Sequence, residues 1–279
     1  MLRRLDWLTL LCMTGLAAGC GEVTLAGPDA GPVPPGSDAA PGSDAGPGGP
    51  RLDAGAPDAA SPPIPNDPSL IAWYPLDTVD DGWSEDVSGN ARPAKCVSIS
   101  GSAACPALVE GQIGMAMDFD EDLHLRVDGS DGFFDTTDGF TVAAWVWLEP
   151  PLDSAPLSKM FGTGSGNSWQ FEYSDTGEPA FTTTNADSKR VDYDDTPVQP
   201  ATWVHLAGTW DGTTKRFYVD GALKFELPFV VDFDGSDFLI GGDENSAAPA
   251  LMFGGRIDDV RIYDRALDGD EILALVQAR

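Results

Sequence analysis

The chain has 279 residues, of which 42% are hydrophobic and 22% are charged, and its formal net charge is −29. Residues 67–279 contain 38 acidic and 13 basic side chains, which gives this part a net charge of −25. This charge excludes nucleic acid as an expected partner, because binding to phosphates requires clustered cations. The same acidity helps an exported protein to stay in solution and suits the binding of cations.

Residues 1–20 have the pattern of an export signal. A basic start precedes an apolar run from Trp7 to Ala18, and this run is too short to span a bilayer, which needs about 20 apolar residues. Cys20 follows Ala-Ala-Gly directly, and this context resembles a bacterial lipobox, in which the cysteine is lipidated. The alternative is an ordinary cleaved signal with a chance cysteine. Gly21 follows the cysteine, and lipoproteins without an aspartate at this position resemble those sorted to the outer membrane, so we expect a lipid-anchored envelope protein.

Residues 21–66 are predicted to form a disordered tether. They contain 9 Gly and 11 Pro among 46 residues and almost no large apolar side chains. Such a segment cannot bury enough surface to offset its ordering entropy. Its expected role is to hold the following domain away from the membrane.

Residues 67–279 are long enough for one large β domain. Short β-rich runs separated by Asp, Gly, Ser, Asn and Pro predict an all-β sandwich or barrel. Asp220-Gly221 lies between two such runs and is typical of a tight hairpin. In the run from Phe140 to Leu148 both alternating faces are apolar, which is typical of a central strand. The end of the chain differs, because Asp268 and Glu271 have the spacing of a capping box before one short helix.

Cys96 and Cys105 are the cysteines of this domain. In an oxidising compartment two cysteines that close a short loop most simply form a disulfide. By restricting the unfolded loop, this bridge is expected to contribute about 2 to 3 kcal/mol. A zinc site is not expected, since the sequence has neither a CxxC pair nor a nearby histidine.

An ordered set of motifs across the domain resembles laminin-G-like or concanavalin-A-like jellyroll modules of bacterial surface proteins. The motifs are LIAWYPLD, EDVSGN, GQIGMAMDF, FTVAAWVWL, TWVHLAGTWDGTTKRFYVDGAL and FGGRIDDVRIYDRALDGDEI. The resemblance implies an antiparallel two-sheet β-sandwich, with a glycan or a protein as ligand. It also implies a possible calcium site, whose matching positions here are Asp77, Asp86, Asn90 and Asp258. The alternative for these four residues is hydrogen bonding to backbone amides and nearby side chains without a metal.

Catalysis is not expected from the residue patterns. Glycoside hydrolysis needs two carboxylates that face one sugar. The series Glu172, Asp175 and Glu178 leaves a predicted strand into a turn, and the adjacent Asp258 and Asp259 should point to opposite faces of a strand. His124 and His205 are interpreted as structural, so a serine or cysteine mechanism is not expected either.

Aromatic side chains provide the remaining argument for sugar binding, since aromatic faces can stack on sugar rings. Most tryptophans of the domain are expected in the core, whereas Trp83 lies in a polar stretch and could contact a ligand. The sequence thus predicts a non-catalytic, envelope-anchored module that binds a glycan or a protein. A polysaccharide-cleaving hydrolase or lyase on the same fold, or a purely structural envelope module, are the alternatives.

Overall fold

The structure is a computed structural model that describes residues 67–129, 138–150, 152–159, 168–185, 189–233, 235–245 and 248–278. The predicted export signal, the predicted lipidation site Cys20 and the predicted tether lie outside these residues. None of the described helices is long and apolar enough to cross a membrane.

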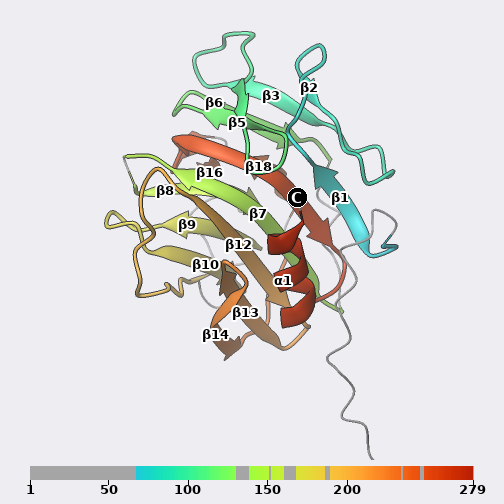
Figure 1. Cartoon of the computed structure of the whole chain (residues 1–279), viewed down its shortest axis with the longest axis vertical. Helices are drawn as coiled ribbons and strands as arrows, with labels where there is room; N and C mark the ends of the chain where they lie inside the picture. The colour runs from blue at the N-terminus through green and yellow to red at the C-terminus, as the bar shows by residue number, and fades with distance from the viewer. Residues whose placement is uncertain are drawn as a thin grey trace, which may run out of the picture. The chain divides into compact units, whose positions relative to one another are not determined.

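Two antiparallel sheets form the predicted β-sandwich (Figure 1). In spatial order the first sheet contains β14 (Ala222–Pro228), β13 (Thr214–Val219), β12 (Trp203–Trp210), β7 (Phe140–Leu148), β18 (Gly255–Tyr263), β5 (Met115–Phe119) and β4 (Ala107–Glu110), and β1 (Leu70–Tyr74) also pairs with β18. The second sheet contains β11 (Lys189–Arg190), β10 (Pro179–Thr184), β9 (Trp169–Tyr173), β8 (Ser154–Lys159), β15 (Phe238–Ile240), β6 (Leu123–Val127), β3 (Ala94–Ser98) and β2 (Trp83–Ser84). A separate hairpin pairs β16 (Asp243–Asn245) with β17 (Ala248–Ala250).

The core lies between the two sheets and is rich in aromatic rings. Phe140 of the first sheet stacks on Trp169 of the second, with 5.9 Å between ring centroids. Phe217 and Phe171 also meet across the sandwich, with 5.7 Å between ring centroids and their planes tilted by 51°. Burial of such rings is the main source of stability in a sandwich core.

Two local predictions are confirmed. β7 lies between β12 and β18, and both of its faces are largely buried, as its two apolar faces indicated. Asp220 and Gly221 connect β13 to β14 with φ values of 51° and 77°, the left-handed conformation that a tight hairpin turn requires.

The predicted disulfide is also present. Cys96 on β3 is bonded to Cys105, which lies 9 residues further along the chain. The bridge ties the loop after β3 back to the second sheet, beside the core that Cys96 contacts.

A β-bulge in β18 overturns the expected geometry of Asp258 and Asp259. The register of β18 against β7 shifts between Asp258 and Arg261, and Asp259 has a φ of 50°. Asp258 pairs with Trp145, whose side chain points away from the core, so Asp258 lies on the outer face of the first sheet. The expectation that Asp258 and Asp259 point to opposite faces was wrong, because the extra residue of the bulge interrupts the regular alternation.

Asp259 points to the same outer side as its neighbour. Its Oδ1 accepts hydrogen bonds from Trp73 Nε1 at 2.7 Å and from Arg261 Nε at 3.1 Å. Arg261 in turn lies over the Trp73 ring, with 4.4 Å to its centroid. Asp259 and Arg261 are 5% and 7% exposed, so this ion pair is buried.

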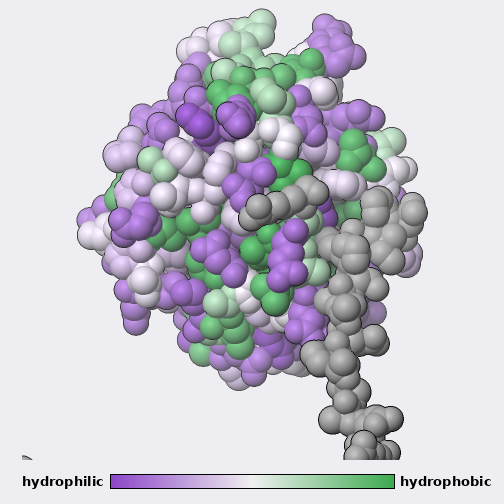
Figure 2. All heavy atoms as spheres, in the orientation of Figure 1, coloured by the Kyte–Doolittle hydropathy of each residue, from purple (hydrophilic) through white to green (hydrophobic). Residues whose placement is uncertain are grey.

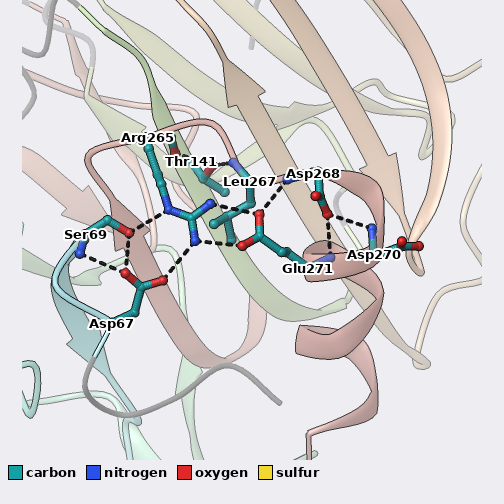
Figure 3. Close-up of polar contacts among 8 residues, drawn as sticks. All are labelled: Asp67, Ser69, Thr141, Arg265, Leu267, Asp268, Asp270 and Glu271. Carbon is teal, nitrogen blue, oxygen red and sulfur yellow. Dashed lines mark hydrogen bonds and ion pairs between the residues drawn. The ribbon is translucent and has the colours of Figure 1, made fainter. Parts of the chain in front are cut away.

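The single helix of the described chain, α1 (Gly269–Gln277), lies across the outer side of the first sheet (Figure 1). Its amino terminus has the predicted capping box, with Asp268 accepting from the backbone of Glu271 and the Glu271 side chain accepting from Asp268 N. Arg265 joins this helix to the start of β1, because its guanidinium contacts both Glu271 and Asp67 (Figure 3). The surface around α1 is mostly hydrophilic, with hydrophobic residues in separate patches (Figure 2).

Candidate functional site

Two of the four predicted calcium ligands, Asp86 and Asn90, are hydrogen-bonded to the main chain. Asp86 Oδ1 accepts from Trp73 N at 3.0 Å and Oδ2 accepts from Arg92 N at 3.1 Å. Asn90 Nδ2 donates to the carbonyls of Leu70 and Ile71, both at 3.2 Å. These bonds fasten the EDVSGN loop to β1, which is the metal-free role that the sequence left open.

The other two, Asp77 and Asp258, meet at the turn before β5. Asp77 Oδ1 accepts from Met115 N at 2.6 Å, and Asp258 Oδ2 accepts from Ile113 N at 2.8 Å. The turn needs Gly111, because a Cβ there would lie 2.6 Å from Asp258 Oδ2. The four predicted ligands therefore divide into two pairs with different local partners.

Asp258 retains one oxygen that could bind a cation. Its side chain is fully buried, and Oδ1 has no hydrogen-bond partner. Burial, together with the nearby carboxylates of Asp259 and Asp77, raises the pKa of Asp258 to about 7. A cation at Oδ1 would offset this burial cost. Among the described residues no three Asp, Glu, His or Cys side chains gather as a metal site, so further calcium ligands would have to be carbonyl oxygens or water.

Trp83 lies at the end of the second sheet and not in a loop. It is 37% exposed, forms part of β2, and pairs with Lys95, whose ammonium lies 5.9 Å from its ring centroid. The pairing places both side chains on the outer face of the second sheet, since the core is lined from β3 by Ala94 and Cys96.

The register of the second sheet continues this outer face across seven strands. One row of cross-strand partners, here called the outer row, consists of Trp83, Lys95, Arg126, Leu239, Ser158, Gln170 and Thr182. Of these, Ser158, Gln170 and Thr182 are polar and fully buried. The middle of the face is therefore a buried polar layer on the side of the sheet opposite the hydrophobic core.

Glu172 is the centre of an ionic cluster beside this row. It follows Gln170 by two residues on β9, so both side chains point outward, and Gln170 Nε2 donates to Glu172 Oε2. Tyr193 Oη donates to Glu172 Oε1 at 3.3 Å, and Lys189 Nζ lies 3.8 Å from Oε2. Glu172 is 6% exposed, whereas the Tyr193 side chain is 41% exposed. A ligand at the surface would therefore contact the tyrosine ring first and the carboxylate beneath it.

The β16–β17 hairpin adds further carboxylates to the layer. Burial is the main cause that raises the pKa of Asp243 to about 7, and the charge of Glu172 contributes to the same shift. The neighbouring Glu244 contacts Arg126 Nη2, and its Oε1 lies 3.5 Å from His124 Nε2. Burial lowers the pKa of His124. The layer thus combines carboxylates, cations, an amide and hydroxyls within one surface.

Several polar atoms of the layer have unused hydrogen-bonding capacity. Gln170 Oε1, Thr182 Oγ1 and Thr184 Oγ1 are buried and have no hydrogen-bond partner. Gln170 donates to Glu172, and Thr182 pairs with Gln170 across β9 and β10, whereas Thr184 lies further along β10. Buried polar atoms are normally satisfied by protein, water or a ligand. Hydrogen-bonding capacity therefore remains unused beneath the surface of this face.

Glu172 was not expected to be catalytic, because the series of acids to which it belongs leaves the predicted strand. The structure confirms that this series leaves the strand. β9 ends at Tyr173, and Ser174 N and Glu178 O close the following turn at 3.0 Å. The carboxylate whose charge interacts with Glu172 is instead Asp243 of β16, about 70 residues later in the chain. A sequence signal does exist: Gln170 and Glu172 alternate with three aromatic residues, which indicates a strand with one polar buried face.

The two histidines occupy opposite sheets. His124 belongs to the polar layer, whereas His205 lies on the outer face of the first sheet against Trp145, with 5.1 Å between ring centroids. Burial lowers the pKa of His205 to about 3, so it is neutral at neutral pH. His205 is 1% exposed, and this burial agrees with its expected structural role.

A family model described as the concanavalin A-like lectin/glucanases superfamily matches residues 120–273. The chain therefore belongs to this superfamily, as its sequence motifs predicted. No curated protein matches the chain. The superfamily contains both lectins and glucanases. Membership therefore determines the fold, whereas the activity has to be inferred from the residues of the site.

Solved structures with the same fold come from binding domains and enzymes. Domain 4 of AbnA, an extracellular arabinanase from Geobacillus stearothermophilus solved with arabinotriose, has a TM-score of 0.60 at 22% identity, over 75% of this chain and 98% of that domain. The binding domain of Paraclostridial Mosquitocidal Protein 1 has a TM-score of 0.56 at 15% identity, over 75% of this chain and 52% of that one. A Trypanosoma rangeli sialidase with 2,3-difluorosialic acid has a TM-score of 0.57 at 17% identity, over 75% of this chain and 33% of the sialidase. At these identities the likeness concerns the fold alone.

Proposed function

We propose that this chain is an envelope-anchored binding module that holds a glycan on the outer face of the second sheet. The observation that carries the proposal is the buried polar layer around Glu172, whose carboxylate accepts hydrogen bonds from the exposed Tyr193 and from Gln170, an amide whose oxygen has no hydrogen-bond partner. Sugars combine apolar ring faces with many hydroxyls, and such a surface offers partners for both. The arabinotriose complex of the similar AbnA domain supports the same choice of ligand.

A glycan array followed by titration calorimetry tests this proposal. We expect the full chain to retain at least one neutral oligosaccharide, and Glu172→Gln to weaken that binding about tenfold, which corresponds to about 1.4 kcal/mol. The matched control is Glu110→Gln, which removes an exposed carboxylate from β4 of the first sheet. Retention of no sugar by the parent chain would contradict glycan binding and leave a protein ligand or a structural role as the explanation.

Polysaccharide cleavage is the second candidate, and Asp243 is the observation that favours it. Glycoside hydrolysis uses one carboxyl that is protonated near neutral pH and a second that is ionised. Asp243, with a pKa of about 7, meets the requirement for the protonated carboxyl, and Glu172 is a second carboxylate whose charge acts on it. Cleavage would be established if the parent chain releases reducing ends from a polysaccharide that it binds and if this release is lost in both Asp243→Asn and Glu172→Gln. Retention without release would establish binding alone.

We also propose that calcium stabilises the domain through Asp77 and Asp258. The fully buried Asp258 Oδ1 supports this, because a cation would supply the partner that it lacks. When bound, the ion would tie β18 to the turn before β5. We expect calcium to raise the melting temperature of chelator-treated protein by several degrees, and Asp258→Asn to abolish the increase. If neither calcium nor chelator changes the melting temperature, the proposed calcium site is contradicted.

The envelope location is proposed from the sequence pattern of residues 1–20. Lipidation of Cys20 would anchor the chain, and the Pro- and Gly-rich segment 21–66 would separate the domain from the membrane. Mass spectrometry of the mature protein tests this directly. A diacylglyceryl group on an amino-terminal Cys20 is expected, and a Cys20→Ser variant should no longer partition with membranes.

A further inference from the structure

A second aromatic surface lies on the outer face of the first sheet. Trp147 and Trp203 are cross-strand partners on β7 and β12, both half-buried, and their rings meet edge to face at 5.7 Å. Arg256 of β18 continues the row on the other side and lies 5.1 Å from the Trp147 ring centroid. Tryptophans buried in a core give no contact area to a ligand, but these two are partly open to solvent. We call this surface the tryptophan platform.

An open groove begins at Trp203. Its volume is about 250 Å³, and it runs between the β13–β14 turn and the segment before β12. Besides Trp203, its apolar wall includes Pro197 and Val198. The volume suits one or two sugar rings and is too small for a folded partner.

Polar groups line the same groove on several sides. Lys224 of β14 forms an ion pair with Asp194 at 2.9 Å, and this pair links the two walls of the groove. Gln199 is exposed at the rim of the groove. The Asp220 side chain is held in position by a hydrogen bond that its Oδ1 accepts from His205 N at 2.9 Å. Donors and acceptors thus surround one indole ring, and this combination fits a hydroxyl-bearing ring better than a purely apolar ligand.

Unpartnered polar atoms also lie next to the platform. Trp145 Nε1 and His205 Nδ1 are buried, have no hydrogen-bond partner, and belong to residues two positions from Trp147 and Trp203 on the same outer face. Arg256 Nε, within the platform itself, is likewise buried and without a hydrogen-bond partner. This part of the first sheet therefore has hydrogen-bonding capacity that the described protein does not use.

From this arrangement we propose that the groove at Trp203 is a second glycan-binding site, specific for neutral sugars. The carboxylates of Asp194 and Asp220 face a single lysine there, and residues 67–279 carry a net charge of −25, so acidic sugars are repelled. The groove lies at the edge of the sandwich, between β12–β14 of the first sheet and residues 194–199, and its Asp194 directly follows Tyr193 of the polar layer. The two sites are therefore neighbours, but the groove at Trp203 and the layer around Glu172 use different side chains. With both sites occupied, one domain contacts two glycan chains or two parts of one chain.

Side-chain NMR of the full chain with 15N-labelled tryptophan tests the site. The probes are arabinotriose, xylotriose and cellotriose, with sialyllactose as the acidic comparison, and a Trp203→Phe variant assigns the resonance. We expect a saturable shift of the Trp203 indole with at least one neutral trisaccharide and none with sialyllactose. Gln199→Ala, an exposed change that keeps the tryptophan, should weaken binding threefold or more, whereas Glu110→Gln should not.

Glu172→Gln separates this site from the one on the second sheet. The Trp203 shift should persist in that variant even if binding at the polar layer is lost. Absence of any Trp203 shift with all three neutral trisaccharides at millimolar concentration overturns the second site. A Trp203 shift that disappears in Glu172→Gln, or one caused by sialyllactose alone, overturns it as well.

Discussion

Replacing Lys215 with methionine is expected to lower the free energy of unfolding by about 3 kcal/mol. Lys215 lies on the core face of β13 with no exposed side-chain area. Its ammonium donates to Phe181 O at 3.1 Å and to Thr183 Oγ1 at 2.9 Å, and it lies 2.6 Å from Asp192 Oδ2. Methionine has a similar volume but leaves all three oxygens without their cation, and breaking a buried pair at one end costs about 3–5 kcal/mol. Arg190 also contacts Asp192, so the lower end of this range applies.

The next residue on the same strand provides the control. Arg216 pairs with Asp211 and Glu226 at the surface, where its side chain is 26% exposed. Arg216→Ala should therefore cost only about 1 kcal/mol or less. Urea unfolding of both variants and the parent measures the difference. Equal losses for the two variants would show that the buried cation has no special role.

The second large effect concerns pH, through Asp243. Its pKa of about 7 in the folded chain, caused mainly by burial, lies above the ordinary aspartate value of about 4. Between these values the native state binds more protons than the unfolded state, so stability falls as pH rises and the loss is complete above about pH 7. The slope reaches at most about 1.4 kcal/mol per pH unit for one group. Asp243→Asn removes this contribution, so we expect the free energy of unfolding of the variant, relative to the parent, to rise by about 3 kcal/mol between pH 4.5 and pH 8.

Comparison with the parent removes the other titrating groups from this test. The lowered pKa values of His124 and His205 make stability rise with pH, but they act in both proteins and cancel in the difference. Asp175→Asn, which changes an exposed carboxylate of the turn after β9, serves as the control. Its stability should follow the parent at every pH. A constant difference between Asp243→Asn and the parent would contradict the proposed protonation.

Local sequence patterns predicted the parts of the fold that depend on near neighbours. The Asp220-Gly221 hairpin follows from the left-handed conformation that those residues tolerate. The Asp268 and Glu271 capping box involves residues three positions apart and can be identified before any packing is known. Order and spacing of the motifs also predicted the sandwich and its family. The hairpin and the capping box are encoded within single segments, and the family is encoded in the order of such segments along the chain.

The bulge in β18 shows that strict alternation of side chains along a strand was too simple a rule for this segment. Ile257 and Val260 both face the core although they are three residues apart, which is incompatible with regular alternation. That spacing was visible in the sequence and could have predicted that Asp258 and Asp259 share a side. It could not have predicted that the turn at Gly111 buries Asp258, since that contact joins segments about 145 residues apart.

The sequence by itself determined the class of fold, the disulfide and the acidic character of the chain, because hydrophobic alternation, cysteine spacing and charge are local or additive properties. The tertiary structure alone decided which polar side chains become neighbours. Glu172 and Asp243 lie on strands far apart in the chain, and their proximity depends on the register of the second sheet and the position of the β16–β17 hairpin. Trp147 and Trp203 become one surface only through strand pairing. The proposed sites arise from long-range pairing, which a pattern read along one segment does not contain.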